Sequence, residues 1–204
     1  MLNASNLEAL LREVRACRTC EPHLPLGPRP VLRAALSARV LIAGQAPGTK
    51  VHESGLPWDD ASGARLRDWL GMDRDVFYDE TRVAIIPQGF CYPGRGKNGD
   101  LPPRKECEQL WHSRLFAALP NLQVFVLAGR YAHAYHLGPR RKRTLTETVR
   151  VWRDYAPHYF PLPHPSWHNN RWLKINPWFE TECVPALRAA VHSLVRPDPV
   201  GAAR

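Results

Sequence analysis

Long apolar runs are missing from this sequence. No stretch of its 204 residues approaches the roughly 20 apolar residues that a membrane-spanning helix needs. The opening residues, MLNASNLEALLREV, are amphipathic and lack the long apolar core of a secretory signal. The phosphate-binding motif G-x-x-x-x-G-K-[ST] is absent too, which argues against a P-loop nucleotide-binding protein. The sequence therefore predicts a soluble, cytoplasmic protein without a membrane partner.

Acidic residues are outnumbered. The chain has 28 Lys and Arg against 19 Asp and Glu, which gives a net charge of +9. Such a balance favours a polyanionic partner, although a solvated basic surface would give the same count. Seven tryptophans favour nucleic acid further, because aromatic side chains beside basic groups stack on bases.

The composition suits a single folded unit. With 44% hydrophobic residues the chain has ample material for a core, and its length fits one domain. We expect this domain at residues 1–195 and a disordered tail at residues 196–204.

Four short apolar runs have the character of buried strands. Continuous runs of this kind are typical of a parallel sheet that is covered on both faces. Helical patterns lie between them, so we expect a three-layer α/β/α sandwich with a central, mainly parallel four-stranded sheet. The strand runs are 39-RVLIAG-44, 82-RVAIIP-87, 122-LQVFVLAG-129 and 158-HYFPLP-163.

The helices have sequence signals of their own. Ser5 to Glu8 reads as a capping box that opens a helix to about Ala16. Further helical patterns follow Ser62, span about 104–119, start near Arg130, and span about 178–195.

Each strand run is followed at once by a polar or Gly/Pro-rich loop. The loops are GQAPG, PQGFCYPG, AGRYAH and HPSWHN. Because the carboxyl ends of parallel strands meet at one edge of the sheet, where ligands bind, we expect all four loops to share one cleft.

The five cysteines argue against a disulfide framework in a cytoplasmic protein. Cys17 and Cys20 form a C-x-x-C, and Cys91 and Cys107 make a second pair. Four thiols are the number needed for a Cys₄ iron–sulfur cluster or a structural zinc. Unrelated core thiols and a redox C-x-x-C are the alternatives. We interpret Cys183, which stands alone in the last helix, as a buried packing thiol.

Two segments could bind a ligand in the cleft. In 44-GQAPG-48, the glycines let the backbone approach a ligand and Pro47 sets the turn, although a plain turn would look the same. Asp59 and Asp60 follow Trp58. Either carboxylate could orient a water or stabilise a cation, although Asp60 and Ser62 are also both reasonable helix N-caps. Trp58 could be core or could stack on a flat ring.

The loops after the second and fourth strands add basic and polar groups. Arg95 and its neighbours suit phosphates, but a solvated basic loop would look alike, and the same holds for 140-RRKR-143. His164 could donate to an oxygen that gains negative charge, or it could be structural. Ser166 and Asn169 could bind a phosphate and a base.

Together these motifs resemble the uracil-DNA glycosylase superfamily. Its first motif, of GQDPY or GEAPG type, is similar to Gly44–Gly48, and its second begins His-Pro-Ser, as at 164–166. The cysteine order is similar to that of the iron–sulfur families four and five. The resemblance spans roughly residues 17–194. It implies a structural [4Fe–4S] cluster, or alternatively structural zinc, on Cys17, Cys20, Cys91 and Cys107.

The departures from the family patterns point to a separate branch. Gln45 replaces the acidic residue of family four, and Pro87 replaces the asparagine that reads uracil there. Asp60-Ala61-Ser62-Gly63 resembles the catalytic GDASG-like segment of family five. Trp167-His168-Asn169 replaces the Pro-Arg-Asn of related bacterial sequences. The missing asparagine predicts looser base selection that includes hypoxanthine or xanthine.

The resemblance implies hydrolysis of the N-glycosidic bond of uracil or another deaminated base in DNA. Asp60 would assist the water, with Asp59 as the alternative, and His164 would stabilise the leaving base. Trp167 would be the wedge that enters the DNA stack, with His168 as the second candidate. A monomer is expected, and a damage-binding protein without turnover is the rival. The implied base pocket comprises Gly44, Gln45, Ala46, Pro47, Trp58, Asp59, Phe90 and Asn169. The implied DNA contacts are Ser166, Trp167, His168, Arg171, Arg95 and Arg130.

Overall fold

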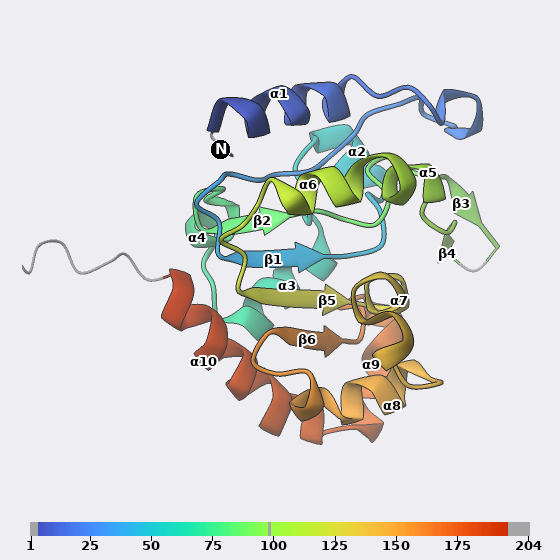
Figure 1. Cartoon of the computed structure of the whole chain (residues 1–204). Helices are drawn as coiled ribbons and strands as arrows, with labels where there is room; N and C mark the ends of the chain where they lie inside the picture. The colour runs from blue at the N-terminus through green and yellow to red at the C-terminus, as the bar shows by residue number, and fades with distance from the viewer. Residues whose placement is uncertain (1–3, 98, 196–204) are drawn as a thin grey trace, which may run out of the picture.

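The computed structural model describes residues 4–97 and 99–195 and is built around a parallel sheet (Figure 1). Its four strands have the order β2-β1-β5-β6, and every pairing is parallel. Each strand lies within one of the four apolar runs, so the predicted parallel sheet is confirmed. The strands are β1 (Val40–Ala43), β2 (Val83–Ile85), β5 (Val124–Ala128) and β6 (Tyr159–Leu162).

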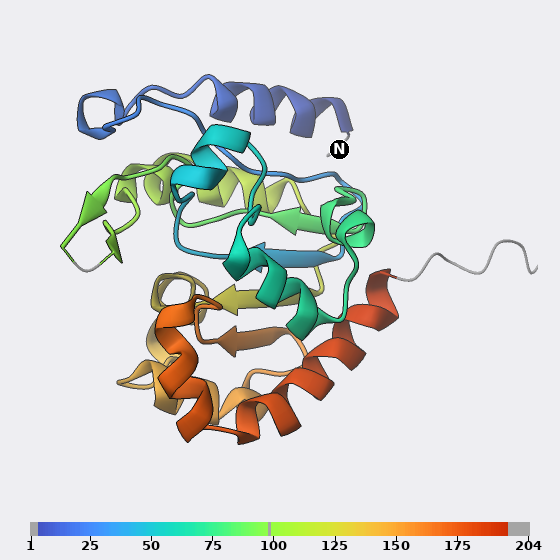
Figure 2. The ribbon, with the colours of Figure 1, turned by 180° about the vertical axis from the view of Figure 1, so that it is seen from behind.

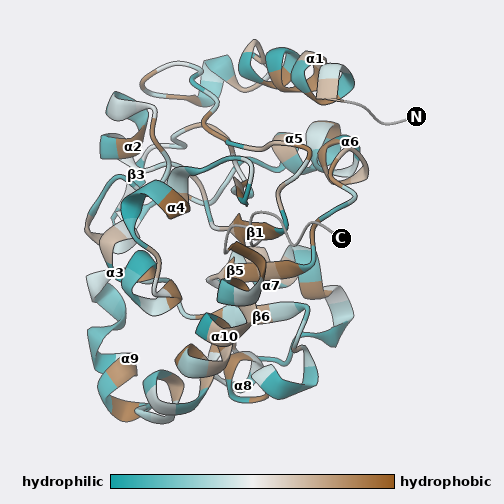
Figure 3. Ribbon diagram, turned by 90° about the vertical axis from the view of Figure 1, so that its left-hand side faces the viewer, coloured by the Kyte–Doolittle hydropathy of each residue, from teal (hydrophilic) through white to brown (hydrophobic). Residues whose placement is uncertain are grey.

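Alternate residues of β1 belong to two different cores. Val40 and Ile42 pack in one buried cluster, whereas Leu41 and Ala43 pack in another on the opposite face. A sheet buried on both faces needs apolar side chains at every position, which is why the strand runs are continuous. Figure 3 shows the hydrophobic strands between the helical layers, as expected for the three-layer sandwich.

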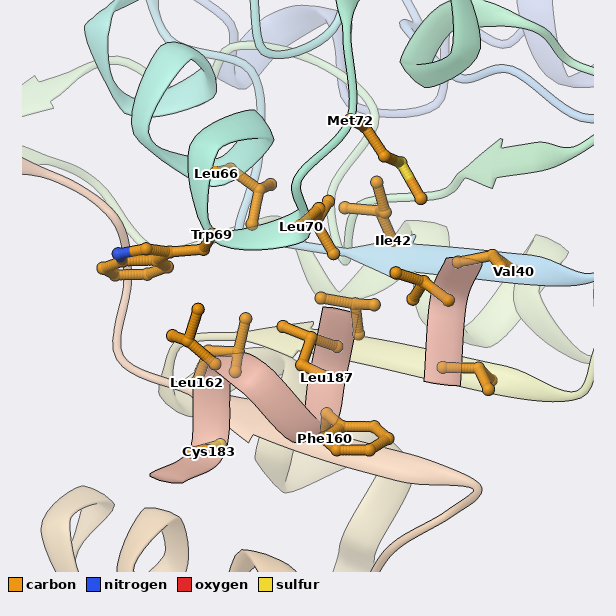
Figure 4. Packing of buried hydrophobic residues seen from close by; sticks show 14 of the residues in the cluster. Val40, Ile42, Leu66, Trp69, Leu70, Met72, Phe160, Leu162, Cys183 and Leu187 are labelled. Carbon is orange, nitrogen blue, oxygen red and sulfur yellow. The ribbon is translucent and has the colours of Figure 1, made fainter. Parts of the chain in front are cut away.

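Two groups of helices cover the sheet. The face of Val40 and Ile42 is covered by α3 (Ala61–Leu70) and α10 (Val184–Val195), as Figures 2 and 4 show. The buried, unpaired Cys183 packs there, which confirms its interpretation as a packing thiol. The other face is covered by α1 (Ala4–Arg15), α6 (Ser113–Ala117) and α7 (Arg130–Leu137).

Three expected helices differ in detail. Ser5 lies inside α1 rather than at its cap, so the predicted capping box is wrong. The helix expected at 104–119 comprises α5 (Lys105–Cys107), the π-helical turn η2 (Glu108–His112) and α6. The last helix begins with the π-helical turn η6 (Phe179–Cys183).

Several further short elements were not predicted, among them one helix that begins with a Thr144-x-x-Glu147 capping box. The helices among them are α2 (Thr49–Ser54), α4 (Arg74–Tyr78), α8 (Leu145–Arg150) and α9 (Asn170–Ile175). The 3₁₀ turns are η1 (Glu21–His23), η3 (Gly138–Arg140), η4 (Trp152–Asp154) and η5 (Trp167–Asn169).

A small hairpin also escaped prediction. Strands β3 (Arg95–Gly96) and β4 (Gly99–Asp100) pair antiparallel. The glycines at 94, 96 and 99 have the spacing G-x-G-x-x-G, but Arg95–Gly96 and Gly99–Asp100 are paired strands rather than the strand-to-helix turn of a dinucleotide site.

Two expectations concern the chain as a whole. Within residues 4–97 and 99–195, every helix is too short or too polar to cross a bilayer. The tail predicted to be disordered, 196–204, lies outside the described residues.

Candidate functional site

A cleft of about 340 Å³ lies at the carboxyl edge of the sheet. The loops after β1, β2 and β6 contribute to it, as the sequence predicted. The loop after β5 does not line the cleft. Gly129 in that loop lies close to His164 instead, because a Cβ on Gly129 would be 3.4 Å from the His164 Cβ. Three of the four loops therefore share the cleft. The lining includes residues 44–48, Trp58, Asp60, Ser62, Pro87, Asp100, His164, Ser166 and His168.

The two adjacent aspartates face different surroundings. Asp60 is the N-cap of α3, where its Oδ1 accepts the Gly63 N–H at 2.8 Å, and it lines the cleft. Asp59 is not among the lining residues and pairs with Arg74 at 2.9 Å. One carboxylate is thus presented to a ligand while its neighbour is held by an arginine.

Trp58 forms a wall of the cleft in a strained backbone conformation. Its φ is 59°, which is rare for a bulky residue. Gly44 and Gly63 make room for it, because a Cβ would lie 2.6 Å from the Trp58 ring at Gly44 and 1.7 Å from the Trp58 carbonyl oxygen at Gly63. The ring centroid lies 5.5 Å from that of His164. Strain of this kind clusters at ligand sites and needs strong support from its neighbours.

Replacing Gly63 with alanine tests this support. In most helices alanine is more stable than glycine by about 1 kcal/mol. Here the new Cβ would collide with the Trp58 backbone, so we expect Gly63→Ala to lower the free energy of unfolding by about 1–3 kcal/mol. Urea denaturation followed by tryptophan fluorescence measures the change. A variant as stable as the natural protein would contradict the packing described.

His164 is half-buried at the carboxyl end of β6. Burial lowers the pKa of its imidazole; nearby Asp60 raises it and His168 lowers it further. A lowered pKa leaves the ring neutral at pH 7, with one N–H to donate. The His164 carbonyl accepts the Asn169 Nδ2–H at 2.7 Å. Asn169 therefore braces this loop rather than lining the cleft, which is not the base contact expected for it.

The rest of the second motif reaches the surface. The Ser166 carbonyl accepts a hydrogen bond from Arg65 at 3.1 Å, and no sequence pattern had singled out Arg65. Trp167 is 71% exposed and stacks on His168 with centroids 3.8 Å apart. An exposed aromatic pair beside a cleft suits contact with stacked bases.

The remaining predicted residues are spread out. Arg95, Arg130 and Arg171 are all exposed, and Arg130 lies over the Tyr131 ring, 4.7 Å from its centroid. Phe90 does not reach the cleft: it is 1% exposed and donates its N–H to the Cys107 Sγ at 3.4 Å. Its sequence position after β2 was right for a cleft loop, but its side chain turns into the protein.

Four cysteines surround a second, much smaller cavity of about 20 Å³. Cys17, Cys20, Cys91 and Cys107 come from three segments and line it together. Burial raises the pKa of Cys91 to about 11 and that of Cys107 to about 12. Among the described residues, no group of three or more His, Cys, Asp or Glu is arranged to hold a single metal ion.

Asp100 is a cleft residue that no sequence pattern singled out. It lies at the end of β4 and lines the cleft. Burial raises the pKa of its carboxyl, Arg95 lowers it and Asp60 raises it. The adjacent Leu101 carbonyl accepts a hydrogen bond from the Gln45 side chain at 3.0 Å. An isolated acid in a glycine-rich loop gives no pattern by which it could have been found.

Fold and site together define a three-layer α/β protein with a half-buried histidine and a carboxylate at the carboxyl edge of a parallel sheet. The model of the uracil DNA glycosylase superfamily matches residues 32–188, and the chain belongs to that superfamily. This is a family of DNA repair glycosylases, which are hydrolases that act on DNA.

The chain is also similar to a solved structure, the NMR structure of a candidate uracil DNA glycosylase from Methanosarcina acetivorans. The two chains share 18% identity over 78% of this chain and 97% of that one, with a TM-score of 0.45.

Proposed function

We propose that this protein hydrolyses the N-glycosidic bond of uracil, and of other deaminated bases, in DNA. The observation that carries the proposal is that Asp60 and His164 line one cleft beside the Trp58 ring. The cleft volume of about 340 Å³ lies within the usual range for small-molecule sites, and the target base must be flipped out of the stack to enter it.

The reaction builds positive charge on the sugar and negative charge on the base. Water attacks C1′ while the C1′–N bond breaks, and the bonding electron pair leaves with the base. Asp60 has one oxygen bound to Gly63, so its other oxygen is available to orient the water, take its proton and stabilise the sugar cation. Neutral His164 donates its N–H to the base oxygen that becomes anionic. Trp58 stacks on the flipped ring.

The glycines of the first motif fit this arrangement. Gly44 allows the Trp58 ring to close over the turn, and the backbone N–H groups of Gln45 and Ala46 would bind the other edge of the base. Pro87, which lines the cleft, offers no side-chain hydrogen bond. We therefore propose that hypoxanthine and xanthine are accepted as well.

A release assay tests the function. The purified protein is incubated with oligonucleotides that carry a single uracil, hypoxanthine or xanthine, and free base and abasic DNA are measured. Release of uracil supports the proposal. Binding of the damaged oligonucleotide without release would favour the rival, a damage-binding protein without turnover. Strict dependence on uracil would contradict the looser base selection.

Trp167 is the proposed wedge. A wedge fills the gap left by a flipped base, so it matters in a duplex and not in a single strand. We expect Trp167→Ala to lower kcat/KM about 10-fold on duplex DNA, which is within the range of one lost stacking contact, and to leave single-stranded activity nearly unchanged. Parallel kinetics on both substrates measure this. Equal losses on both would contradict the role.

We propose that Cys17, Cys20, Cys91 and Cys107 hold a [4Fe–4S] cluster, because all four thiols line one cavity. When bound, the cluster would supply structural support, joining the N-terminal segment to the loop after β2 and to α5. We expect anaerobically purified protein to be brown, with about four iron atoms per chain by metal analysis. Colourless protein with one zinc per chain would contradict the cluster and favour structural zinc.

The cysteine outside this cavity supplies the control for the cluster. Cys107→Ala should remove the iron, whereas Cys183→Ala, made in the core on the far face, should retain it. Iron retained in Cys107→Ala would contradict the assignment of the ligands.

A further inference from the structure

Asp100 is a second carboxylate in the cleft, and no role in the family motifs covers it. Asp60 and Asp100 are the acidic residues among the described ones that line the cleft. The Asp100 Oδ2 lies 3.4 Å from the point where a Cβ on Gly48 would be. Its carboxylate therefore occupies the space beside the end of the 44–48 turn, where a side chain at position 48 would otherwise reach.

The hairpin that carries Asp100 is held against this turn. The Gln45 side chain binds the Leu101 carbonyl at 3.0 Å, and the Leu101 N–H binds the Gly94 carbonyl at 2.8 Å. Figure 1 shows the hairpin beyond the carboxyl ends of β1 and β2, next to α5. Asp100 is exposed, but its neighbour Leu101 is thus tied to the same 44–48 turn that lines the cleft.

The two carboxylates have different hydrogen-bonding states. One carboxylate oxygen of Asp60 accepts the hydrogen bond from Gly63 that caps α3. Within residues 4–97 and 99–195, no group donates a hydrogen bond to the Asp100 carboxylate, and the charges that act on it are Arg95 and Asp60. With respect to the described residues, both Asp100 oxygens are therefore available to a ligand, and an ionised carboxylate only accepts hydrogen bonds.

Deamination changes a base edge in a way that an acceptor can read. Cytosine and adenine carry an unprotonated ring nitrogen beside the exocyclic amine. After deamination, uracil and hypoxanthine carry a ring N–H at that position, beside a carbonyl. An acceptor placed there binds uracil or hypoxanthine through the ring N–H. It repels the lone pair on the ring nitrogen of cytosine or adenine. Such a site disfavours cytosine and adenine strongly, because the acceptor of the site would then have no hydrogen-bond donor.

We propose that Asp100 is a specificity-determining residue that accepts the ring N–H of the flipped base. This inference rests on the proposed glycosylase function and names its substrate class: bases with an N–H next to a carbonyl on the edge that faces the hairpin. The Asp100 carboxylate supplies the acceptor that Pro87 lacks.

A substrate that lacks the N–H tests the pairing directly. Kinetics are measured on oligonucleotides with uracil or 3-methyluracil, for the natural protein and for Asp100→Ala, which also makes room for the methyl group. We expect the natural protein to prefer uracil in kcat/KM by about 10–100-fold, the range of a lost hydrogen bond to a charged group. In Asp100→Ala this ratio should fall toward 1. A ratio unchanged by the substitution would overturn the inference.

Further variants separate recognition from folding. Asp100→Asn keeps an acceptor oxygen and should retain part of the preference for uracil. Asp75→Ala, which removes an exposed acid outside the cleft lining, should keep all of it. Equal losses on both substrates together with a lower Tm in Asp100→Ala would show a structural role and overturn the inference.

The outcomes also separate this inference from the proposed function. If the natural protein releases none of the bases, the glycosylase function fails and the inference falls with it. If it releases uracil with a preference that does not depend on Asp100, only the inference fails.

Discussion

Asp60→Asn is expected to lower kcat for uracil release by about 10²–10⁴-fold, the range for loss of a positioned general base. Asparagine caps a helix as well as aspartate does, so α3 should keep its start and the fold its stability. What is lost is the negative charge that orients the water and stabilises the sugar cation. Single-turnover kinetics measure the chemical step, and DNA affinity should change little.

Asp59→Asn is the matched control, because it removes the same charge one position away. Asp59 pairs with Arg74 and does not line the cleft. Loss of a partly exposed ion pair costs at most about 1 kcal/mol of stability, and kcat should stay within a few-fold of the natural value. A large loss of kcat in Asp59→Asn with little effect of Asp60→Asn would reverse the assignment of the two carboxylates.

A steep loss of stability below pH 6 is the second large effect expected. Burial lowers the pKa of His112 and His133 to about 4 and that of His136 to about 3. In the unfolded chain these histidines bind protons near pH 6.5, whereas in the folded chain they bind protons only at a lower pH. Because the unfolded state binds more protons, stability is full above pH 6.5 and falls as the pH drops toward 4.

The size of this effect is comparable with the stability of a whole domain. A shift of one pKa unit is worth about 1.4 kcal/mol, so each of His112 and His133 costs about 3 kcal/mol by pH 4. Typical domains have only about 5–15 kcal/mol to lose. Urea denaturation at pH 7.5, 6, 5 and 4.5 measures the trend.

One substitution isolates a single histidine. His112 packs among the rings of Phe90, Phe116 and Tyr135, so phenylalanine suits its place. His112→Phe should flatten the pH dependence by about 1.4 kcal/mol per pH unit between pH 6 and 4. The exposed His158 supplies the control, and His158→Phe should leave the slope unchanged. If His112→Phe left the slope unchanged, protonation of His112 would not be a cause of the loss of stability in acid.

The strands were predictable because their signal is local. Val40 to Ala43 are all apolar since both faces of the sheet are covered, and the same reasoning located the other three strands. The capping box at Ser5 was wrong because the Ser-x-x-Glu pattern also fits inside a helix that starts one residue earlier. Short elements such as α2 and the β3–β4 hairpin depend on packing partners that no local pattern reveals.

Only part of the candidate site could likewise be predicted from local patterns. His164 and the 44–48 turn follow strands directly, so the rule that strand ends meet at one edge was enough to bring them together. Phe90 follows β2 just as closely, yet its side chain lies at the cysteine cavity, because the direction in which a loop side chain points depends on its three-dimensional neighbours.

Local patterns were sufficient to predict the parallel sheet, the family motifs and the set of chemical groups, because periodicity and spacing are properties of the chain alone. Packing between distant segments was needed to separate the two aspartates, because it pairs Asp59 with Arg74 and leaves Asp60 in the cleft. It also brought Asp100 beside Gly48, 52 positions earlier in the chain. Such contacts depend on hydrogen bonds between segments far apart in the chain, such as that from Gln45 to Leu101, which no local pattern encodes.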